Sequence, residues 1–405
     1  MRILIVSQYF WPENFRINDL AGGLVERGHD VTILTGIPNY PDGKFFPGYG
    51  LFKKLREGYK GVKVIRVPLI PRGAGSGKRL ALNYISFALF ASIFAPFLGR
   101  RKYDLIFVFQ MSPVTVGIPA IVLKKMMRVP VFFWIQDLWP ESLSATGAIS
   151  SKRVLNSVRR LVCFIYKHCD RILIQSPAFA PLIESQGVSP ERISYFPNSV
   201  EKLYIPIPKQ SSLEGMAEIP IGFLVMFAGN IGAAQDFPTI LAAANKLRNY
   251  KEIHWVVLGD GRARPWVEAE INKTGLKEKV HLLGRFPMES MPYYFSMADI
   301  MLVTLRNETI FSLTIPSRIQ SYLACGKPIV AALNGEGGRV VVESGAGFAS
   351  PPEDADALAE SVLAMYRMPQ KEREAMGMRG KEYCEENFER EMLIDRLEGW
   401  MRELT

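Results

Sequence analysis

The chain has 405 residues, of which 48% are hydrophobic and 22% charged, and a net charge of +9. This length is too great for one ordinary hydrophobic core, and the composition is that of a globular protein, so we expect two domains of about 200 residues each. The four cysteines form no CxxC pair and no metal-ligand spacing with the four histidines. They are therefore expected to be the reduced, buried thiols of a cytosolic protein.

The charge is distributed unevenly along the chain. Residues 1–205 contain 27 basic and 13 acidic side chains, whereas the remainder contains 22 basic and 27 acidic ones. A basic half predicts contact with something anionic, and lipid headgroups or phosphorylated substrates would satisfy that charge. We expect no nucleic acid, because the basic residues are spread through an α/β pattern without a recognition helix.

The first apolar run covers residues 3–6 and predicts a buried strand. It is too short for the core of a signal peptide, so no export is expected. Similar runs recur, separated by segments that can form helices, and continuous apolar strands of this kind predict parallel sheets covered on both faces. The other runs cover residues 31–35, 62–67, 105–109, 131–134, 172–174, 193–196, 223–228, 255–258, 280–283, 300–303 and 329–332. The predicted fold is α/β, with two Rossmann-like doubly wound domains.

The alternation of strands and helices pauses at 200–220, where prolines, serines and glycine give the composition of a linker. We therefore expect an N-terminal domain at 1–205 and a C-terminal domain at 206–384. Residues 385–405 have the pattern of an amphipathic helix and are expected to pack back toward the N-terminal domain. Two such domains would bind ligands at the carboxyl ends of their strands, on opposite walls of a cleft.

Residues 81–98 are mostly apolar and are flanked by basic residues at 78–79 and 100–102. Their length is near the lower limit for a membrane span, but Asn83, Ser86 and Pro96 interrupt them. We favour an interfacial helix with cationic ends on an anionic membrane surface, and the alternative is an ordinary buried crossover helix. The aromatic residues expected to share its membrane-facing side are Phe87, Phe90, Phe94 and Phe97.

Two glycine-rich segments resemble phosphate loops without matching them. The run at 73–79 has Arg79 where a P-loop needs Ser or Thr, and the turn that begins at Gly259 has Arg264 in place of the third glycine of the dinucleotide fingerprint. No metal signature is evident, so we expect no metal and no cofactor.

A stronger signal is the turn Gly229, Asn230, Ile231, Gly232, which follows a predicted buried strand and precedes a predicted helix. Backbone N–H groups of such a turn can bind a phosphate, although a tight turn without a ligand has the same pattern. Further along the chain stand LGDG at 258–261, VHLLGR at 280–285, ADI at 298–300, PSR at 316–318 and LACGKPIV at 323–330.

In this order and spacing the chain resembles the family-4 retaining glycosyltransferases of the GT-B fold, which build bacterial surface polysaccharides. The resemblance covers nearly the whole length. The N-terminal segments YFWPE at 9–13, RGHDVT at 27–32, PNYP at 38–41 and DLWPES at 137–142 resemble the L-fucosamine transferases of O-antigen and capsule clusters.

The resemblance implies a donor site in the C-terminal domain. Residues 229–232 and Gly259 would surround the donor diphosphate, Arg285 and Phe286 would border the nucleobase, and Arg318 and Lys327 would oppose the phosphate charge. Arg318 is the better candidate, because arginine can bind phosphate oxygens in a bidentate manner.

The chain departs from the family pattern at two places. The family's pair of glutamates, spaced eight residues apart, would fall at Leu313 and Ser321, so the ribose-binding carboxylate is missing unless Gln320, Glu308 or Glu336 replaces it. The basic pair that often follows the glycine turn is replaced by Asn230 and Gln235. Gln320 and Ser321 therefore stay candidates for the donor site.

In the N-terminal domain, Asp137 and Glu141 stand where the family often has a catalytic histidine. A carboxylate there can accept the proton of an acceptor hydroxyl or balance a developing oxocarbenium charge. The alternative for Asp137 is a helix N-cap.

The resemblance implies a glycosyltransferase on the cytoplasmic face of the inner membrane. It would use a UDP-sugar donor, N-acetyl-L-fucosamine being one candidate, and a polyprenyl-diphosphate-linked acceptor. The alternatives are a nucleotide-sugar 2-epimerase of the same architecture and a scaffold without activity, which the missing glutamates would suit.

Overall fold

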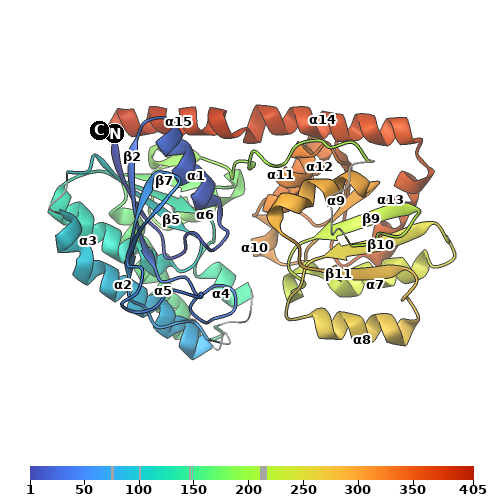
Figure 1. The fold of residues 1–405 in the computed structure, drawn as a ribbon, viewed down its shortest axis with the longest axis horizontal. Helices are drawn as coiled ribbons and strands as arrows, with labels where there is room; N and C mark the ends of the chain where they lie inside the picture. The colour runs from blue at the N-terminus through green and yellow to red at the C-terminus, as the bar shows by residue number, and fades with distance from the viewer. Residues whose placement is uncertain (74–76, 100–101, 146, 148, 210–216) are drawn as a thin grey trace. The chain divides into compact units, whose positions relative to one another are not determined.

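The computed structural model describes residues 1–405 apart from 74–76, 100–101, 146, 148 and 210–216 (Figure 1). The chain divides into two compact units, of which unit 1 contains Met1–Asn198 and Glu391–Thr405 and unit 2 contains Ser199–Arg390. Unit 2 begins before position 206 because the intervening segment packs on it. The backbone N–H of Val200 donates to the carbonyl oxygen of Phe388, and the ring of Tyr204 stacks on Phe295 at 5.9 Å.

Unit 1 is built on an eight-stranded sheet in the order β3-β4-β2-β1-β5-β6-β7-β8. The strands are β1 (Arg2–Val6), β2 (Asp30–Gly36), β3 (Arg56–Tyr59), β4 (Val62–Val67), β5 (Leu105–Gln110), β6 (Val131–Ile135), β7 (Arg171–Ile174) and β8 (Ile193–Tyr195). All neighbours are parallel except β3 and β4, which form an antiparallel pair. Strand β3 was not predicted, because its sequence REGY has no apolar run and lies at the sheet edge.

Helices cover both faces of this sheet (Figure 1). Ile3 and Ile5 of β1 share a core with α1 (Arg16–Glu26) and α15 (Arg390–Leu404). On the other face lie α2 (Gly77–Gly99), α3 (Gly117–Met127) and α5 (Lys152–Lys167), with Gly117 close against Phe133 of β6. The short helices are α4 (Glu141–Ala145) and α6 (Ala180–Ser185).

The C-terminal segment is two helices instead of one. Helix α14 (Gln370–Phe388) belongs to unit 2, the extended residue Glu389 ends it, and α15 then packs in the core of unit 1. Leu393, Ile394 and Leu397 supply the apolar contacts. Arg27 pairs with Glu391 at 3.0 Å at the edge of the same surface.

Unit 2 contains six parallel strands in the order β11-β10-β9-β12-β13-β14. They are β9 (Phe223–Ala228), β10 (Ile253–Leu258), β11 (Val280–Gly284), β12 (Ile300–Thr304), β13 (Ile329–Ala332) and β14 (Gly347–Ser350). One face carries α7 (Phe237–Lys246), α8 (Arg264–Thr274) and α13 (Ala355–Arg367). The other face carries α9 (Met291–Met297), α11 (Ser317–Ala324), α12 (Glu336–Glu343) and α14, and α10 (Thr309–Ser312) is a single short turn.

Both sheets have a point where the strand order reverses. In unit 1 it lies between β1 and β5, and in unit 2 between β9 and β12. Ligands of doubly wound proteins bind at the carboxyl ends of the strands beside such a point. The loops after β1 and β5, and those after β9 and β12, are therefore where each unit is expected to bind a ligand.

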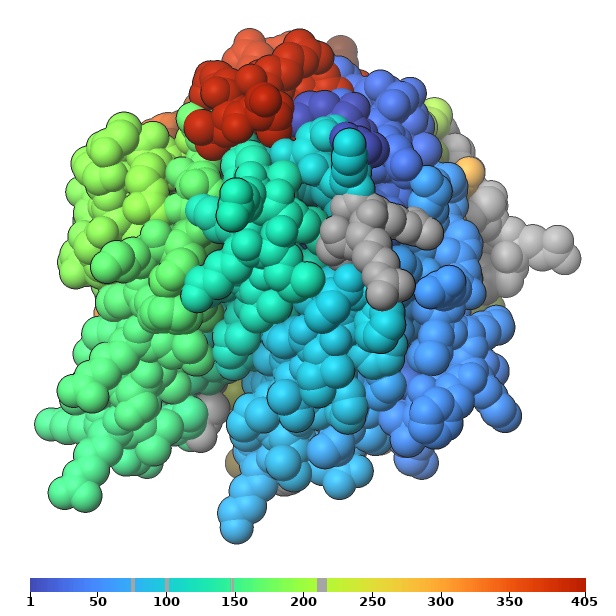
Figure 2. All heavy atoms as spheres, turned by 90° about the vertical axis from the view of Figure 1, so that its left-hand side faces the viewer, coloured from blue at the N-terminus to red at the C-terminus, as the bar shows by residue number. Residues whose placement is uncertain are grey.

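Helix α2 is long and apolar enough to cross a membrane, although 39% of its apolar window is buried inside the protein. Of the four aromatic residues expected on its membrane-facing side, Phe97 is exposed and the other three are not. Phe87 is fully buried, and Phe90 and Phe94 are partly buried, because this side of the helix packs on the sheet and on α3. The exposed stripe consists of Leu82, Ile85, Leu89, Ile93 and Phe97, which are 47–62% exposed. Figure 2 shows the face of unit 1 to which α2 contributes, in light blue. Of the basic residues expected at the end of this helix, those at positions 100 and 101 lie outside the described residues.

Candidate functional site

The glycine turn of unit 2 lies at the carboxyl end of β9, directly against the turn after β10. A Cβ atom on Gly259 would lie 1.8 Å from the carbonyl oxygen of Gly229, and both glycines have a φ of 147°. Only glycine allows the two turns to approach so closely. The N–H groups of Gly229 and Ile231 donate to Leu258 and Asp260, which leaves those of Asn230 and Gly232 outside this ladder.

Arg318 of α11 reaches this turn. Its Cζ lies 4.6 Å above the ring of Phe227, and its Nη2 would be 3.0 Å from a Cβ atom on Gly229. Within the described ranges it forms no ion pair with a carboxylate, and its buried Nη1 has no hydrogen-bond partner. Burial lowers the pKa of Arg318. A desolvated cation without a counter-charge is costly, so the position suits an anionic ligand.

Lys327 does not lie with Arg318 and the glycine turn. It precedes β13, and its Nζ donates to the carbonyl oxygens of Ser296 and Ala298 at the amino ends of the strands. The register pairs Ile329 with Met301 and Met301 with Met226, so about five residues of strand, roughly 16 Å, separate Lys327 from Gly229. Burial lowers the pKa of Lys327 to about 8. Its place in the structure is that of a buried structural lysine.

Gln320 and Ser321 are buried in α11. Gln320 is two residues from Arg318 in the sequence, and its backbone carbonyl oxygen accepts from the thiol of Cys384 in α14. The hydroxyl of Ser321 donates to Ser317 at 3.4 Å. Tyr322 occupies the Arg318 side instead, and its hydroxyl accepts from the N–H of Ala228 at 3.0 Å.

The residues after β11 lie beside the same turns. The N–H of Gly259 donates to Gly284, and the exposed Arg285 places its Nε 3.9 Å from Asp260. Phe286 packs its ring on Tyr294 at 4.5 Å. The structure therefore brings together residues 229–232, Gly259, Arg285, Phe286 and Arg318.

The structure describes the carboxylates that were considered as replacements for the missing pair. Glu336 is held by Arg339 at 2.8 Å, and Glu308 is exposed at the start of α10. Neither Leu313 nor Ser321 supplies a carboxylate. Among the described residues, no group of three or more His, Cys, Asp or Glu is arranged to hold a metal ion.

In unit 1, Asp137 lies in the loop after β6. Its Oδ2 accepts from the indole Nε1 of Trp139 at 3.0 Å, and burial raises its pKa. Asp137 is not an N-cap, because α4 begins four residues later at Glu141. The Oε1 of Glu141 lies 3.4 Å from Arg159, whereas its Oε2 is buried without a partner in the described structure.

Tyr84 and Arg72 join Asp137 at the carboxyl edge of this sheet, and the sequence had not indicated either. The ring of Tyr84 meets Trp139 edge to face at 6.0 Å, and the charges of Asp137 and Arg72 both act on its hydroxyl. The one feature of the sequence that could have indicated Tyr84 is its polar hydroxyl within the apolar stretch 81–98.

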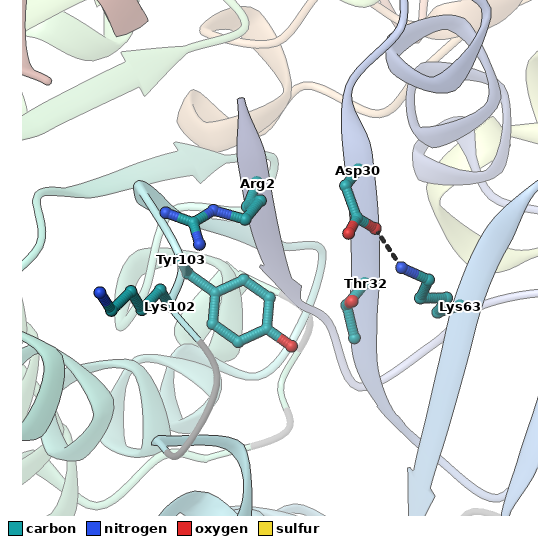
Figure 3. Close-up of a pocket in the computed structure, with 6 residues that line it drawn as sticks. All are labelled: Arg2, Asp30, Thr32, Lys63, Lys102 and Tyr103. Atoms are coloured by element: carbon teal, nitrogen blue, oxygen red, sulfur yellow. Dashed lines mark hydrogen bonds and ion pairs between the residues drawn. The ribbon is translucent and has the colours of Figure 1, made fainter.

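A separate pocket of about 390 Å³ lies at the opposite edge of the unit 1 sheet (Figure 3). Its lining residues are Arg2, Asp30, Thr32, Lys63, Lys102 and Tyr103. Lys63 pairs with Asp30 at 2.6 Å and Arg2 with Asp104 at 2.9 Å, so two of its cations already have partners. Because it lies at the amino ends of the strands, we do not assign it to the reaction.

Two family models match the chain. The glycosyl transferase 4-like domain matches residues 14–199, and the glycosyl transferases group 1 model matches residues 220–383. WcaI of Escherichia coli strain K12, named for colanic acid biosynthesis, is 24% identical over 97% of this chain and 98% of its own length. WbjE of Pseudomonas aeruginosa, named as a glycosyltransferase, is 28% identical over 57% of this chain and 59% of its own, so that likeness spans under two thirds of either protein.

Solved structures have the same fold. HepE of Anabaena in complex with UDP and glucose superposes with a TM-score of 0.72 at 15% identity over 99% of both chains. WaaG, a glycosyltransferase involved in lipopolysaccharide biosynthesis, superposes with a TM-score of 0.66 at 14% identity over both whole chains. The predicted fold, GT-B with two Rossmann-like domains, is thereby confirmed.

Proposed function

The chain is a glycosyltransferase of the GT-B type, and we propose that it transfers a sugar from a UDP-sugar donor to a lipid-linked oligosaccharide acceptor in surface polysaccharide biosynthesis, with retention of configuration. N-acetyl-L-fucosamine is the sugar implied by the resemblance of the segments at 9–13, 27–32, 38–41 and 137–142 to L-fucosamine transferases. The kinship to WcaI and to WaaG supports an envelope polysaccharide as the product.

One observation carries the donor half of this proposal. The buried guanidinium of Arg318 lies beside Gly229 with an unsatisfied N–H, and the N–H groups of Asn230 and Gly232 are outside the backbone ladder of the same turn. A cation and backbone donors at one point are suited to a diphosphate. HepE has been solved with UDP and with UDP-glucose, which is consistent with UDP as the nucleotide.

Unit 1 carries the acceptor half of the proposal. In this proposal Asp137 takes the proton of the acceptor hydroxyl or balances positive charge on the donor sugar. We also propose that unit 1 docks on the cytoplasmic leaflet through the exposed stripe of α2. The exposed basic residues Lys78 and Arg79 at the start of α2 would meet anionic headgroups.

A ligand panel tests the proposed function against its alternatives. A specific ligand raises the melting temperature by mass action, so UDP and one UDP-sugar should raise it and GDP and dTDP should not. Transfer of that sugar to a prenyl-diphosphate-linked saccharide should then be seen by mass spectrometry. A scaffold would show no nucleotide effect, and a 2-epimerase would convert the UDP-sugar without an acceptor.

A further inference from the structure

The loops after five strands of unit 1 meet beside the point where its strand order reverses. They contribute Tyr9 after β1, Asn39 after β2, Arg72 after β4, Ser112 after β5 and Asp137 after β6. Tyr84 of α2 lies among them, and the electrostatic effects on its hydroxyl come from Ser112, Arg72, Tyr9 and Asp137. This group of residues is separate from the glycine turn of unit 2, which binds the donor in the proposed function.

Arg72 is the cation of this group. Its Cζ lies 4.8 Å above the ring of Tyr40, and the side chain is partly buried. In the part of the chain that the structure describes, its guanidinium forms no ion pair and no hydrogen bond; only its backbone N–H is bonded, to Oδ1 of Asn39 at 3.0 Å. The five N–H groups of this guanidinium are therefore available to an anion.

A buried polar network fixes the position of Arg72. Asn39 is itself held by Glu13, because Oε1 of Glu13 accepts from the N–H of Asn39 at 2.8 Å. Asn83 of α2 donates to Ile70 at 2.7 Å and lies 3.4 Å from Asn39, and Gln8 donates to Asn83 at 2.7 Å. These four polar side chains are each at most 3% exposed. The network holds the backbone of Arg72 through Asn39, while the contact printed for its guanidinium is with the ring of Tyr40, so its charge is not used by the network.

Two tyrosine hydroxyls lie close enough to Arg72 for its charge to act on both of them. Tyr9 is 4% exposed, and its hydroxyl lies next to that of Tyr84 without a hydrogen bond of good geometry in the described ranges. Burial raises the pKa of both tyrosines, so both keep their protons at neutral pH. A guanidinium and two neutral phenols are all hydrogen-bond donors, which suits an anion with several oxygens.

The place of this group on α2 indicates which anion it meets. Asn83 and Tyr84 point into the group, whereas their neighbours Leu82 and Ile85 begin the exposed apolar stripe. A molecule with an anionic head bound by Arg72 would thus have an apolar surface within one helical turn for its tail. A prenyl diphosphate has this combination of parts.

We propose that Arg72, with Tyr9 and Tyr84, binds the diphosphate of the prenyl-linked acceptor. This inference rests on the proposed function, since it names the residues that would hold its acceptor. Binding here would place the first saccharide units near Asp137. Besides burial, the charge of that carboxylate raises the pKa of the Tyr84 hydroxyl.

Calorimetry with geranyl diphosphate as the probe tests the site, with inorganic pyrophosphate and geraniol as its separate halves. The wild-type protein should bind geranyl diphosphate more tightly than either half. Arg72→Gln should weaken that binding about 10- to 100-fold, as expected for the loss of charge-assisted hydrogen bonds, and Arg72→Lys should recover part of it. Lys63→Gln is the matched control, because Lys63 is an exposed cation of β4 at the opposite edge of the sheet and should have no effect.

UDP titration of the same variants separates this site from the donor site. Arg72→Gln should bind UDP as the wild type does. If Arg72→Gln loses UDP affinity and keeps geranyl diphosphate affinity, or changes neither, the assignment is overturned. If the wild type binds UDP but no geranyl diphosphate, the acceptor site fails while the donor site stands. If it binds geranyl diphosphate at Arg72 but no UDP, the proposed function fails and this site stands.

Discussion

Oε1 of Glu13 lies 2.8 Å from the backbone nitrogen of Asn39, so one buried carboxyl group ties the loop after β1 to the loop after β2. The same oxygen accepts from the N–H of Tyr40 at 2.7 Å, and the second oxygen accepts from Phe10 at 3.3 Å. Burial nevertheless outweighs these hydrogen bonds and raises the pKa of Glu13 to about 7. The carboxyl group is therefore a source of pH dependence in unit 1.

Stability should fall as the pH rises from about 4.5 toward and beyond 7. Between these values the folded protein holds a proton on Glu13 that the unfolded chain has released, so ionisation favours unfolding. The full shift corresponds to about 3 kcal/mol as an upper value. Glu13→Gln should flatten this dependence, which melting curves of both proteins from pH 5 to 8 would show. Parallel curves for the two proteins would contradict it.

Arg318→Ala should weaken UDP binding by about 1.5–3 kcal/mol, because a charge-assisted hydrogen bond to phosphate is lost. Lys327→Met is the matched control. Lys327 lies at the amino edge of the sheet and bonds to Ser296 and Ala298, so its loss should lower the melting temperature and leave UDP affinity unchanged. If calorimetry showed that Lys327→Met weakens UDP binding and Arg318→Ala does not, the phosphates would lie at the amino ends of the strands instead.

A sequence motif predicts a site residue well only when it also shows at which end of a strand that residue lies. The turn at 229–232 follows from an apolar run and its glycines, and the structure has Arg318 beside that turn; the role of these residues in donor binding stays a prediction. Lys327 stands in an equally clear motif but precedes its strand, and a residue before a parallel strand lies at the edge away from the ligand. The group around Arg72 could not be predicted, because its members come from separate loops that only the folded sheet brings together.

Two glycines of the proposed donor site should respond differently to substitution. A Cβ atom on Gly232 would meet the side-chain tips of Asn230 at 2.5 Å and Gln235 at 3.0 Å, which can move. Gly232→Val should therefore keep the fold and weaken UDP binding. A Cβ atom on Gly259 would meet the backbone of Gly229 at 1.8 Å, so Gly259→Ala should also destabilise unit 2, by about 1–3 kcal/mol.

The control for these two variants is Gly28→Ala in unit 1. Gly28 has a φ of 84° but nothing within 4 Å of a Cβ atom, so it carries the backbone strain without a clash. Gly28→Ala should lower the free energy of unfolding slightly and leave UDP affinity unchanged. Equal UDP affinity in Gly232→Val and the wild type would remove the turn from the donor site.

Asp137→Asn should lower kcat about 10²- to 10⁴-fold with little change in UDP affinity, as expected if the carboxylate takes a proton. The amide can still accept from Trp139, so the loop should keep its conformation. Since the pKa of Asp137 is raised, the wild-type rate should begin to fall at a higher pH than for an ordinary aspartate as the solution is acidified. A variant that loses UDP affinity and rate together would show a structural role instead.

The exposed stripe of α2 should bind anionic membranes. Ile85 and Ile93 are 59% and 54% exposed, so Ile85→Asp with Ile93→Asp should leave the fold and UDP affinity intact while abolishing flotation with phosphatidylglycerol liposomes. Each nearby cation adds about 1 kcal/mol toward such a surface, so salt should release the wild-type protein.

Phe90 and Phe94 are unsuitable targets for this test, because they are partly buried and aspartate there would disturb the fold. Ile221→Asp is the control, since Ile221 is 96% exposed in unit 2 and should not matter. If the wild type ignores liposomes and is instead a dimer that the α2 variant dissociates, the stripe is an interface between two copies of the chain.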